Sequence, residues 1–295
     1  TMKIAPFFPV LLAVAIACQP GNSRREQAAN DAPALQPLPY DLARPTARFE
    51  LPKALREVSG LTFYRNNQLA CVQDEDGDLF LFDVEAGKVT ERLHFGPAGD
   101  YEGVEFANET FYVLRSDGLI FVIRPGADTF QPGGVLFDGT RDVATIVPGL
   151  PPDSDVEGLG YDSRTKRLLI ALKETPGEEK RYVYFYDFGK KVAWKGLVLS
   201  PQKLELEANL TGKDALLKPS GVAVHPKTGE MYVLAADGAK LLVLDRLGIV
   251  RTVARLDPDT FRQPEGICFA PDGTLFIASE GRGGKGYLLK FAETR

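Results

Sequence analysis

The sequence predicts an all-β protein, a β-propeller of five four-stranded blades. A short motif, Ser or Glu followed by Gly and a β-prone run, occurs five times in the 295 residues, at separations of 43 to 63 residues. Each copy is followed by a turn and a second strand, and most copies have a third and a fourth, which is typical of propeller repeats. Insertions at residues 128–153 and 202–217 explain the longer separations, although a sixth, degenerate blade within the second insertion is an alternative. A β-sandwich would give no reason for the motif to recur.

The first 18 residues are predicted to be the signal peptide of a bacterial lipoprotein. Met2 and Lys3 form a short basic start, and the apolar stretch at residues 7–16 is too short to span a bilayer. Small residues then precede Cys18, which we expect to be lipidated and to become the mature N-terminus. An ordinary cleaved signal that contains a cysteine is the alternative. Gln19 follows the cysteine, which favours the outer membrane, facing the periplasm.

Two segments precede the first motif. Residues 19–44 have no apolar period and are predicted to be a flexible tether. The propeller domain is predicted to span residues 45–295, beginning with a strand-like stretch at 47–52. Since the last copy lacks an obvious fourth strand, pairing of this stretch with it would close the ring and leave no bare sheet edge.

Charge and cysteine content narrow the function classes. The formal net charge is −5, with 35 basic and 40 acidic residues, so the chain has no electrostatic footprint for nucleic acid. Cys71 and Cys268 each lie in an apolar strand-like run. Export would allow a disulfide between them, and two buried thiols are the alternative.

The residue before each motif glycine is predicted to lie at one mouth of the central channel. The first strand of a propeller blade lines that channel, and glycine lets neighbouring backbones approach closely there. The five residues that would form this ring are Ser59, Glu102, Glu157, Ser220 and Glu265. Three carboxylates facing one another repel, and Ca²⁺ held by the three glutamates would relieve the repulsion. Alternatively, these side chains bind backbone amides of the next blade and only organise the channel.

Cationic side chains are predicted at the ends of two second strands, close to this ring. Arg115 and Lys173, together with Ser59 and Ser220, would suit a small anionic or polyhydroxylated ligand. Ion pairing between blades is the alternative. No catalytic residue is assigned, because neither histidine has a nucleophile at a recognisable spacing and the sequence contains no G-x-S-x-G motif.

Three blade phrases carry a family resemblance. "DYEGVEFANETFYVLRSDG", "PSGVAVHPKTGEMYVL" and "QPEGICFAPDGTLFIASEGRGGKG" resemble the SdiA-regulated family, whose members are bacterial envelope-associated β-propellers. The resemblance extends over roughly residues 45 to 293, and single phrases are shared with NHL-repeat and gluconolactonase-like propellers. The resemblance implies fold and location better than activity.

The sequence therefore favours an envelope-anchored β-propeller lipoprotein that presents a binding face, with Ca²⁺ in the channel as candidate cofactor. Its partners would be the membrane, through the lipid anchor, and a small ligand or an envelope protein. The alternative, by analogy with gluconolactonase-like and phytase-like propellers, is a Ca²⁺-dependent hydrolase of lactones or phosphoesters. In that case Glu102, Glu157 and Glu265 would hold the metal, and Arg115 or Lys173 would stabilise developing negative charge.

Overall fold

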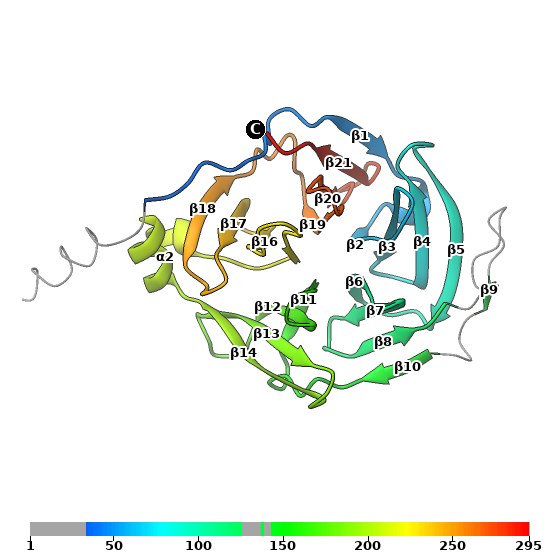
Figure 1. Cartoon of the computed structure of the whole chain (residues 1–295), viewed down its shortest axis with the longest axis horizontal. Coiled ribbons are helices and arrows are strands. Elements are labelled where there is room, and N and C mark those ends of the chain that lie inside the picture. Colours follow the sequence, from blue (N-terminus) through cyan, green and yellow to red (C-terminus); the bar gives the residue numbers. More distant parts are fainter. Residues whose placement is uncertain (1–33, 126–136, 139–142, 295) are drawn as a thin grey trace, which may run out of the picture. The chain divides into compact units, whose positions relative to one another are not determined.

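The computed structural model describes residues 34–125, 137–138 and 143–294, so the predicted signal peptide and lipidation site lie outside the described residues. Over the described ranges the chain forms five β-sheets around a common axis, a five-bladed propeller (Figure 1). The prediction of five blades is confirmed. In place of a sixth sheet, the second insertion contains helix α2 (Pro201–Ala208) and the short helix η3 (Gly212–Ala215).

Blades one and two follow the predicted order of strands from the axis outwards. Blade one contains β2 (Val58–Phe63), β3 (Gln68–Gln73), β4 (Gly77–Asp83) and β5 (Lys88–Gly96), and the short β9 (Phe137–Asp138) pairs in parallel with β5. Blade two contains β6 (Tyr101–Ala107), β7 (Thr110–Arg115), β8 (Ile120–Ile123) and β10 (Val143–Ile146). Both β9 and β10 fall in the first predicted insertion. This insertion therefore supplies the outer strand of blade two, β10, and a short strand that pairs with blade one, β9.

The remaining blades repeat the same antiparallel arrangement. Blade three contains β11 (Asp155–Asp162), β12 (Arg167–Glu174), β13 (Arg181–Asp187) and β14 (Val192–Leu199). Blade four contains β15 (Gly221–Val224), β16 (Met231–Ala235), β17 (Lys240–Leu244) and β18 (Val250–Arg255). Blade five contains β19 (Pro264–Phe269), β20 (Leu275–Ser279), β21 (Tyr287–Phe291) and, as its outer strand, β1 (Ala47–Glu50).

The core consists of apolar layers between neighbouring blades. Alternating side chains of one sheet pack against those of the next, as Leu169 of blade three and Val233 of blade four do. Each pair of adjacent blades has a layer of this kind. Burial of apolar surface, which contributes about 25 cal/mol per Å², thus stabilises every interface around the ring.

The N-terminal strand closes the ring, as predicted. β1 pairs with β21 in antiparallel register, from Ala47 opposite Lys290 to Glu50 opposite Tyr287. The guanidinium of Arg48 also lies over the Tyr287 ring, 3.7 Å from its centroid. The outer edge of blade five is thereby covered by a segment more than two hundred residues away in sequence.

The predicted tether is wrong at its C-terminal end, because the chain already packs on the propeller before residue 45. Leu38, Tyr40 and Leu42 join the apolar layer between blades four and five. The Tyr40 hydroxyl donates to the Gly273 carbonyl oxygen at 2.7 Å. Three apolar side chains within five residues were too weak a period to predict this contact from the sequence.

The cysteines are two buried thiols. Cys71 and Cys268 are both free, so the disulfide alternative is wrong and the thiol alternative is confirmed. Burial raises the pKa of Cys71 to about 12, which keeps this thiol protonated. Within the part of the chain that the structure describes, no helix is both long and apolar enough to cross a membrane.

Closure by β1 predicts a sharp dependence of stability on the N-terminal segment. A variant that begins at residue 53 loses the β1–β21 ladder and exposes a sheet edge, so its melting temperature should fall by about 10 °C or more and it should associate. Calorimetry and size-exclusion chromatography measure both effects. A matched variant that begins at residue 34 keeps every described contact and should melt like the full chain. Equal melting of the two variants would contradict closure.

Candidate functional site

The motif glycines lie where the inner strands of adjacent blades touch. A Cβ atom added to Gly60 would lie 2.8 Å from the Cα of Gly103 in the next blade. One added to Gly221 would lie 2.6 Å from the Glu265 carbonyl oxygen, and one added to Gly266 would lie 2.8 Å from the Cβ of Leu61. Any side chain larger than hydrogen would therefore push blades apart, which confirms the predicted reason for glycine.

The five residues that precede these glycines line one narrow channel, as predicted. Its free volume at this level is about 10 Å³, enough for about one water molecule. Ser59 and Ser220 tie their blades to the next one: the Ser59 hydroxyl donates to the Tyr101 carbonyl at 2.5 Å, and the Ser220 hydroxyl donates to the Pro264 carbonyl at 2.8 Å. Both serines are buried and hold the blades together, but their partners are carbonyl oxygens and not the backbone amides named in the alternative to metal binding.

The three glutamates of the ring are held in a poorly solvated, negatively charged setting. Burial, followed by the charge of Glu157, raises the pKa of Glu102 to about 10. Burial and the charges of Glu157 and Glu280 raise the pKa of Glu265 to about 8. At Glu157 burial raises the pKa to about 7, against the opposing effect of Lys173. These groups therefore retain protons near neutral pH.

Lys173 is the cation that the structure places among these carboxylates. It comes from the end of β12, and its ammonium binds the Glu157 carboxylate and lies 3.9 Å from Asp155. Burial acts to lower the pKa of Lys173, but the hydrogen bond and charge of Glu157 outweigh it, so the pKa is raised and the ammonium stays charged. The prediction that Lys173 lies near acidic groups is confirmed.

Arg115 is engaged elsewhere. It binds Asp117 of its own turn through two hydrogen bonds of 3.0 and 2.7 Å, and its guanidinium lies over the Phe121 ring. It does not line the channel beside the glutamates. Arg115 therefore does not join Lys173 beside the ring glutamates.

Further acids extend the ring outwards into what we call the acidic mouth, defined by Asp74, Glu102, Glu157, Glu265 and Glu280. Burial and the charge of Glu57 raise the pKa of Asp74 to about 6, and burial and the charge of Asp74 raise the pKa of Glu280 to about 7. Two buried polar atoms beside these residues, Oδ1 of Asp74 and Oγ of Ser279, have no hydrogen-bond partner among the described residues. The acidic mouth thus has unused acceptor capacity.

The acidic mouth offers suitable donors for a metal but no preformed cage. Carboxylate and hydroxyl oxygens are the donors that Ca²⁺ prefers. Over the described ranges, however, no group of three or more His, Cys, Asp and Glu side chains is arranged to hold a metal ion. The bound ammonium of Lys173 lies against Glu157, so a metal that used this carboxylate would have to displace it.

The histidines have structural partners. His225 is buried, and its Nε2 lies 3.0 Å from the Tyr40 hydroxyl, while its Nδ1 accepts from the amides of Lys227 and Thr228. Burial lowers the pKa of His225, which favours the neutral ring. His94 lies 3.0 Å from the buried carboxylate of Asp78. Neither ring is poised as a catalytic base.

A cavity that the sequence did not predict lies at the opposite mouth of the channel. It has a volume of about 270 Å³ and is lined by residues of all five blades. Glu105 lies in it and accepts hydrogen bonds from the Thr62 hydroxyl at 2.6 Å and from the Phe106 amide at 2.9 Å. Burial raises the pKa of Glu105 to about 7. The sequence did contain a signal for this cavity. Side chains alternate along a strand with a period of two residues, and Thr62 and Glu105 each lie two residues after a motif glycine, which places both on the channel side.

Comparisons with known proteins agree with this architecture. The sequence profile of the SdiA-regulated family matches residues 46–282, and a search of curated proteins gave no match. Glutaminyl cyclase from Myxococcus xanthus is similar at a TM-score of 0.55 with 13% identity, covering 84% of this chain and 95% of that one. A luciferin-regenerating enzyme is similar at a TM-score of 0.51 with 12% identity, covering 83% and 95%. At these identities the likeness concerns the fold alone.

The raised pKa of Glu265 predicts a characteristic pH dependence of stability. Because the folded state holds this proton more tightly than the unfolded state, the contribution of Glu265 is fully present below about pH 4.5 and is lost as the pH rises towards 8. Glu265→Gln keeps the neutral shape at every pH. Relative to the unmodified protein, its melting temperature should therefore be higher at pH 8 than at pH 5, by about 2 °C or more.

Glu85→Gln is the control for this measurement, because Glu85 lies exposed in the β4–β5 turn. Its melting temperature should follow that of the unmodified protein at both pH values. A constant offset between Glu265→Gln and the unmodified protein from pH 5 to pH 8 would show that Glu265 carries no excess proton in the folded state.

Proposed function

The chain belongs to the SdiA-regulated family, and we propose that it is a binding protein of the cell envelope whose acidic mouth receives Ca²⁺. The observation that carries this proposal is the convergence of buried and half-buried carboxylates from four blades at one channel mouth, each with a raised pKa. Perturbed groups of this kind concentrate at functional sites, because folding alone does not favour them. The single ammonium of Lys173 balances only part of the negative charge that these carboxylates carry when they are ionised.

The chemistry of the mouth favours a hard divalent cation. Once a cation displaces their protons, the carboxylates of Glu102 and Glu265 would supply negative oxygen donors. The unpartnered Oγ of Ser279 and Oδ1 of Asp74 would add further oxygen donors. Calcium would take over from Lys173 as the partner of Glu157. A bound Ca²⁺ would supply a positive centre for hydroxyl or anionic groups of a small ligand or of a partner protein.

Binding at this mouth should be coupled to protons. Glu157 and Glu265, with pKa values of about 7 and 8, hold protons that a cation must displace. Affinity for Ca²⁺ should therefore increase as the pH rises from 6 to 8.

We favour binding over a Ca²⁺-dependent hydrolase of lactones or phosphoesters. A metallohydrolase keeps one metal position open for substrate beside a group that moves protons. Here the side chain nearest to Glu157 is a charged ammonium, and both histidines are held by structural contacts. Of the two cations that the hydrolase hypothesis offers for developing negative charge, Arg115 is bound to Asp117, which leaves Lys173.

The envelope location rests on Cys18, and its test is fractionation. If Cys18 carries the lipid anchor, Cys18→Ala should move the protein from the membrane fraction to the soluble fraction. The measurement is immunoblotting of separated membrane and soluble fractions from cells that express each form. Membrane association that survives the substitution would refute lipidation at this position.

The calcium proposal is tested by thermal unfolding with calcium and with chelator. Calcium should raise the melting temperature, since a ligand that binds only the folded state stabilises it by about 2.7 kcal/mol at one hundred times its Kd. The shift should be larger at pH 8 than at pH 6. Lys173→Gln removes the competing ammonium and should enlarge the shift, whereas adding Glu265→Gln to this variant should reduce it.

Glu105→Gln is the matched control, because it neutralises a buried carboxylate at the opposite mouth. It should leave the calcium-dependent shift unchanged. Identical melting curves with calcium and with chelator at pH 8, in the unmodified protein and in Lys173→Gln, would refute the calcium site and leave the glutamates as channel architecture.

A further inference from the structure

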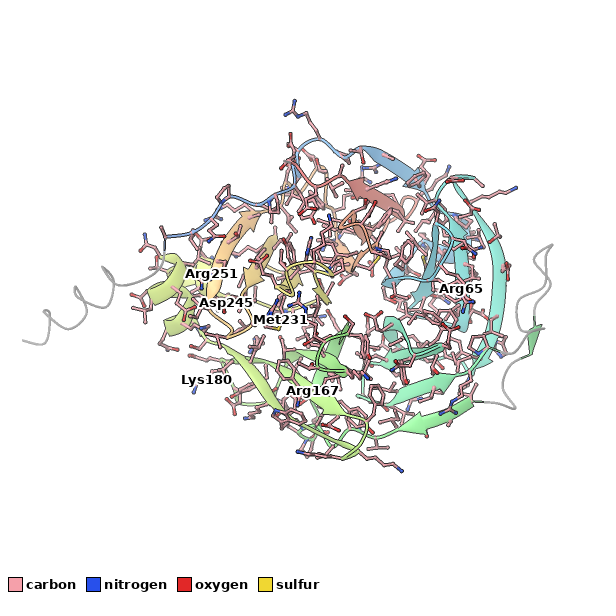
Figure 2. The ribbon with its side chains drawn as sticks, in the orientation of Figure 1. Arg65, Arg167, Lys180, Met231, Asp245 and Arg251 are labelled. Atoms are coloured by element: carbon pink, nitrogen blue, oxygen red, sulfur yellow. The ribbon has the colours of Figure 1, made fainter. Side chains whose placement is uncertain are left out.

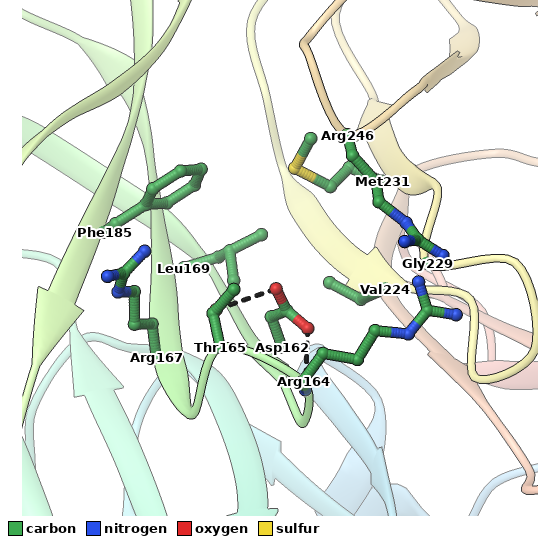
Figure 3. Close-up of a pocket in the computed structure, with 10 residues that line it drawn as sticks. All are labelled: Asp162, Arg164, Thr165, Arg167, Leu169, Phe185, Val224, Gly229, Met231 and Arg246. Atoms are coloured by element: carbon green, nitrogen blue, oxygen red, sulfur yellow. Dashed lines mark hydrogen bonds between the residues drawn. The ribbon is translucent and has the colours of Figure 1, made fainter.

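A second charged site lies away from the acidic mouth, in a cavity between blades three and four (Figure 3). The cavity has a volume of about 240 Å³. One part of its lining is apolar and consists of Leu169, Phe185, Val224 and Met231. The other part carries three arginines, Arg164, Arg167 and Arg246. An apolar surface joined to a cluster of guanidinium groups is the usual composition of a site for an amphiphilic anion.

Two of these arginines converge on the same turn without an acid between them. The Arg164 guanidinium donates to the carbonyl oxygens of Lys227 and Thr228, at 2.8 and 3.2 Å, and Arg246 donates to the Thr228 carbonyl at 2.8 Å. A Cβ atom on Gly229 would lie 2.1 Å from Nη1 of Arg164 and 2.9 Å from Nε of Arg246. Like charges held this close repel, and carbonyl oxygens neutralise neither of them.

The third arginine faces them across the cavity, beside Phe185 (Figure 3). The Arg167 guanidinium lies over the ring of Trp194, 4.9 Å from its centroid, and its Nε is buried without a hydrogen-bond partner. Over the described residues, none of the three arginines forms an ion pair with a carboxylate. The positive charge of this cavity is therefore available to a ligand.

Asp162 is the acid in the cavity lining, and its oxygens are used locally. Its Oδ1 accepts from the Arg164 amide at 3.0 Å and its Oδ2 accepts from the Thr165 hydroxyl at 2.7 Å. These bonds fix the β11–β12 turn and so orient the Arg164 side chain towards Gly229. Asp162 thus positions Arg164 and, among the described residues, forms no ion pair with any of the three guanidinium groups, which leaves the cavity with more positive than negative side chains.

We propose that this cavity binds a small amphiphilic anion. A carboxylate or phosphate head would accept hydrogen bonds from Arg164 and Arg246, whose planar guanidinium groups suit such oxyanions. The aliphatic or aromatic body of the ligand would lie on Leu169, Phe185 and Met231. The ligand must be small, because the cavity lies just below the range of about 300–1,000 Å³ that is usual for drug-sized molecules. This site uses none of the residues of the acidic mouth.

The structure contains its own reporter for this site. Trp194 is the single tryptophan of the chain and carries the Arg167 guanidinium on its face. Titration with octanoate or octyl phosphate should change its fluorescence in a saturable way, and calorimetry should give the same Kd. Acetate and inorganic phosphate offer the head without the apolar body and should bind at least about tenfold more weakly, since a buried CH₂ group contributes about 0.8 kcal/mol. The ratio of the two octyl affinities identifies the preferred head group.

Substitutions at the converging arginines test the proposed contacts. Arg164→Gln and Arg246→Gln should each weaken octyl ligand binding about tenfold or more, as expected for loss of a hydrogen bond between charged groups. Both side chains are exposed, so the variants should fold, which circular dichroism checks. Arg65→Gln is the matched control: Arg65 is paired with Glu109 in another part of the ring, away from Arg167 and Met231 (Figure 2).

The binding measurements on these variants have distinct outcomes for and against the proposed site. Loss of affinity in the two cavity variants, with unchanged affinity in Arg65→Gln, supports the proposal. No saturable binding of either octyl ligand, or binding that the folded double variant of Arg164 and Arg246 retains at unmodified strength, overturns it. Calcium or chelator should not alter this binding, so failure here is distinct from failure of the acidic mouth.

Discussion

The close approach of five inner strands at their glycines is the constraint on which the rest of the structure depends. At Gly60, Gly103 and Gly221 the backbone of the next blade lies where a Cβ atom would be, so the ring has one tight circumference. This contact fixes the width of the channel and brings the residues before the glycines together, although they are far apart in sequence. Because this contact also sets how neighbouring sheets face each other, the apolar layers between blades depend on it as well.

The same constraint creates an electrostatic difference between the two ends of the inner strands. Residues at the starts of β6, β11 and β19 supply the buried carboxylates, whereas the turn after β11 supplies Arg164. Carboxylates that a rigid scaffold holds together cannot move apart, so they keep protons or bind a cation such as Lys173. The two proposed sites therefore differ in the charge of the ligand that each would take: a cation at the acidic mouth and an oxyanion between blades three and four.

The sequence predicted those features that depend on a local pattern. Blade number, the glycine contacts and the ring of Ser59, Glu102, Glu157, Ser220 and Glu265 all follow from one motif and its repetition, and closure follows from the need to cover a sheet edge. Features that depend on packing between distant segments were missed. Tyr40 joins blades four and five through His225 and Gly273, and Arg164 meets Arg246 at Gly229. No local spacing links these residues, since each pair is brought together only by the finished ring.

Comparison of the blades with one another indicates which part of the channel serves the fold and which does not. At the position before the glycine, blades one and four carry Ser59 and Ser220, whose hydroxyls bind the next blade's carbonyl without introducing charge. A small neutral side chain at this position is thus enough to link one blade to the next in blades one and four. Blades two, three and five instead carry glutamates whose burial opposes ionisation, at the position where blades one and four have serine. A group that is costly to bury and is not needed for closure is better explained by binding than by stability, because residues that break a local rule concentrate at functional sites.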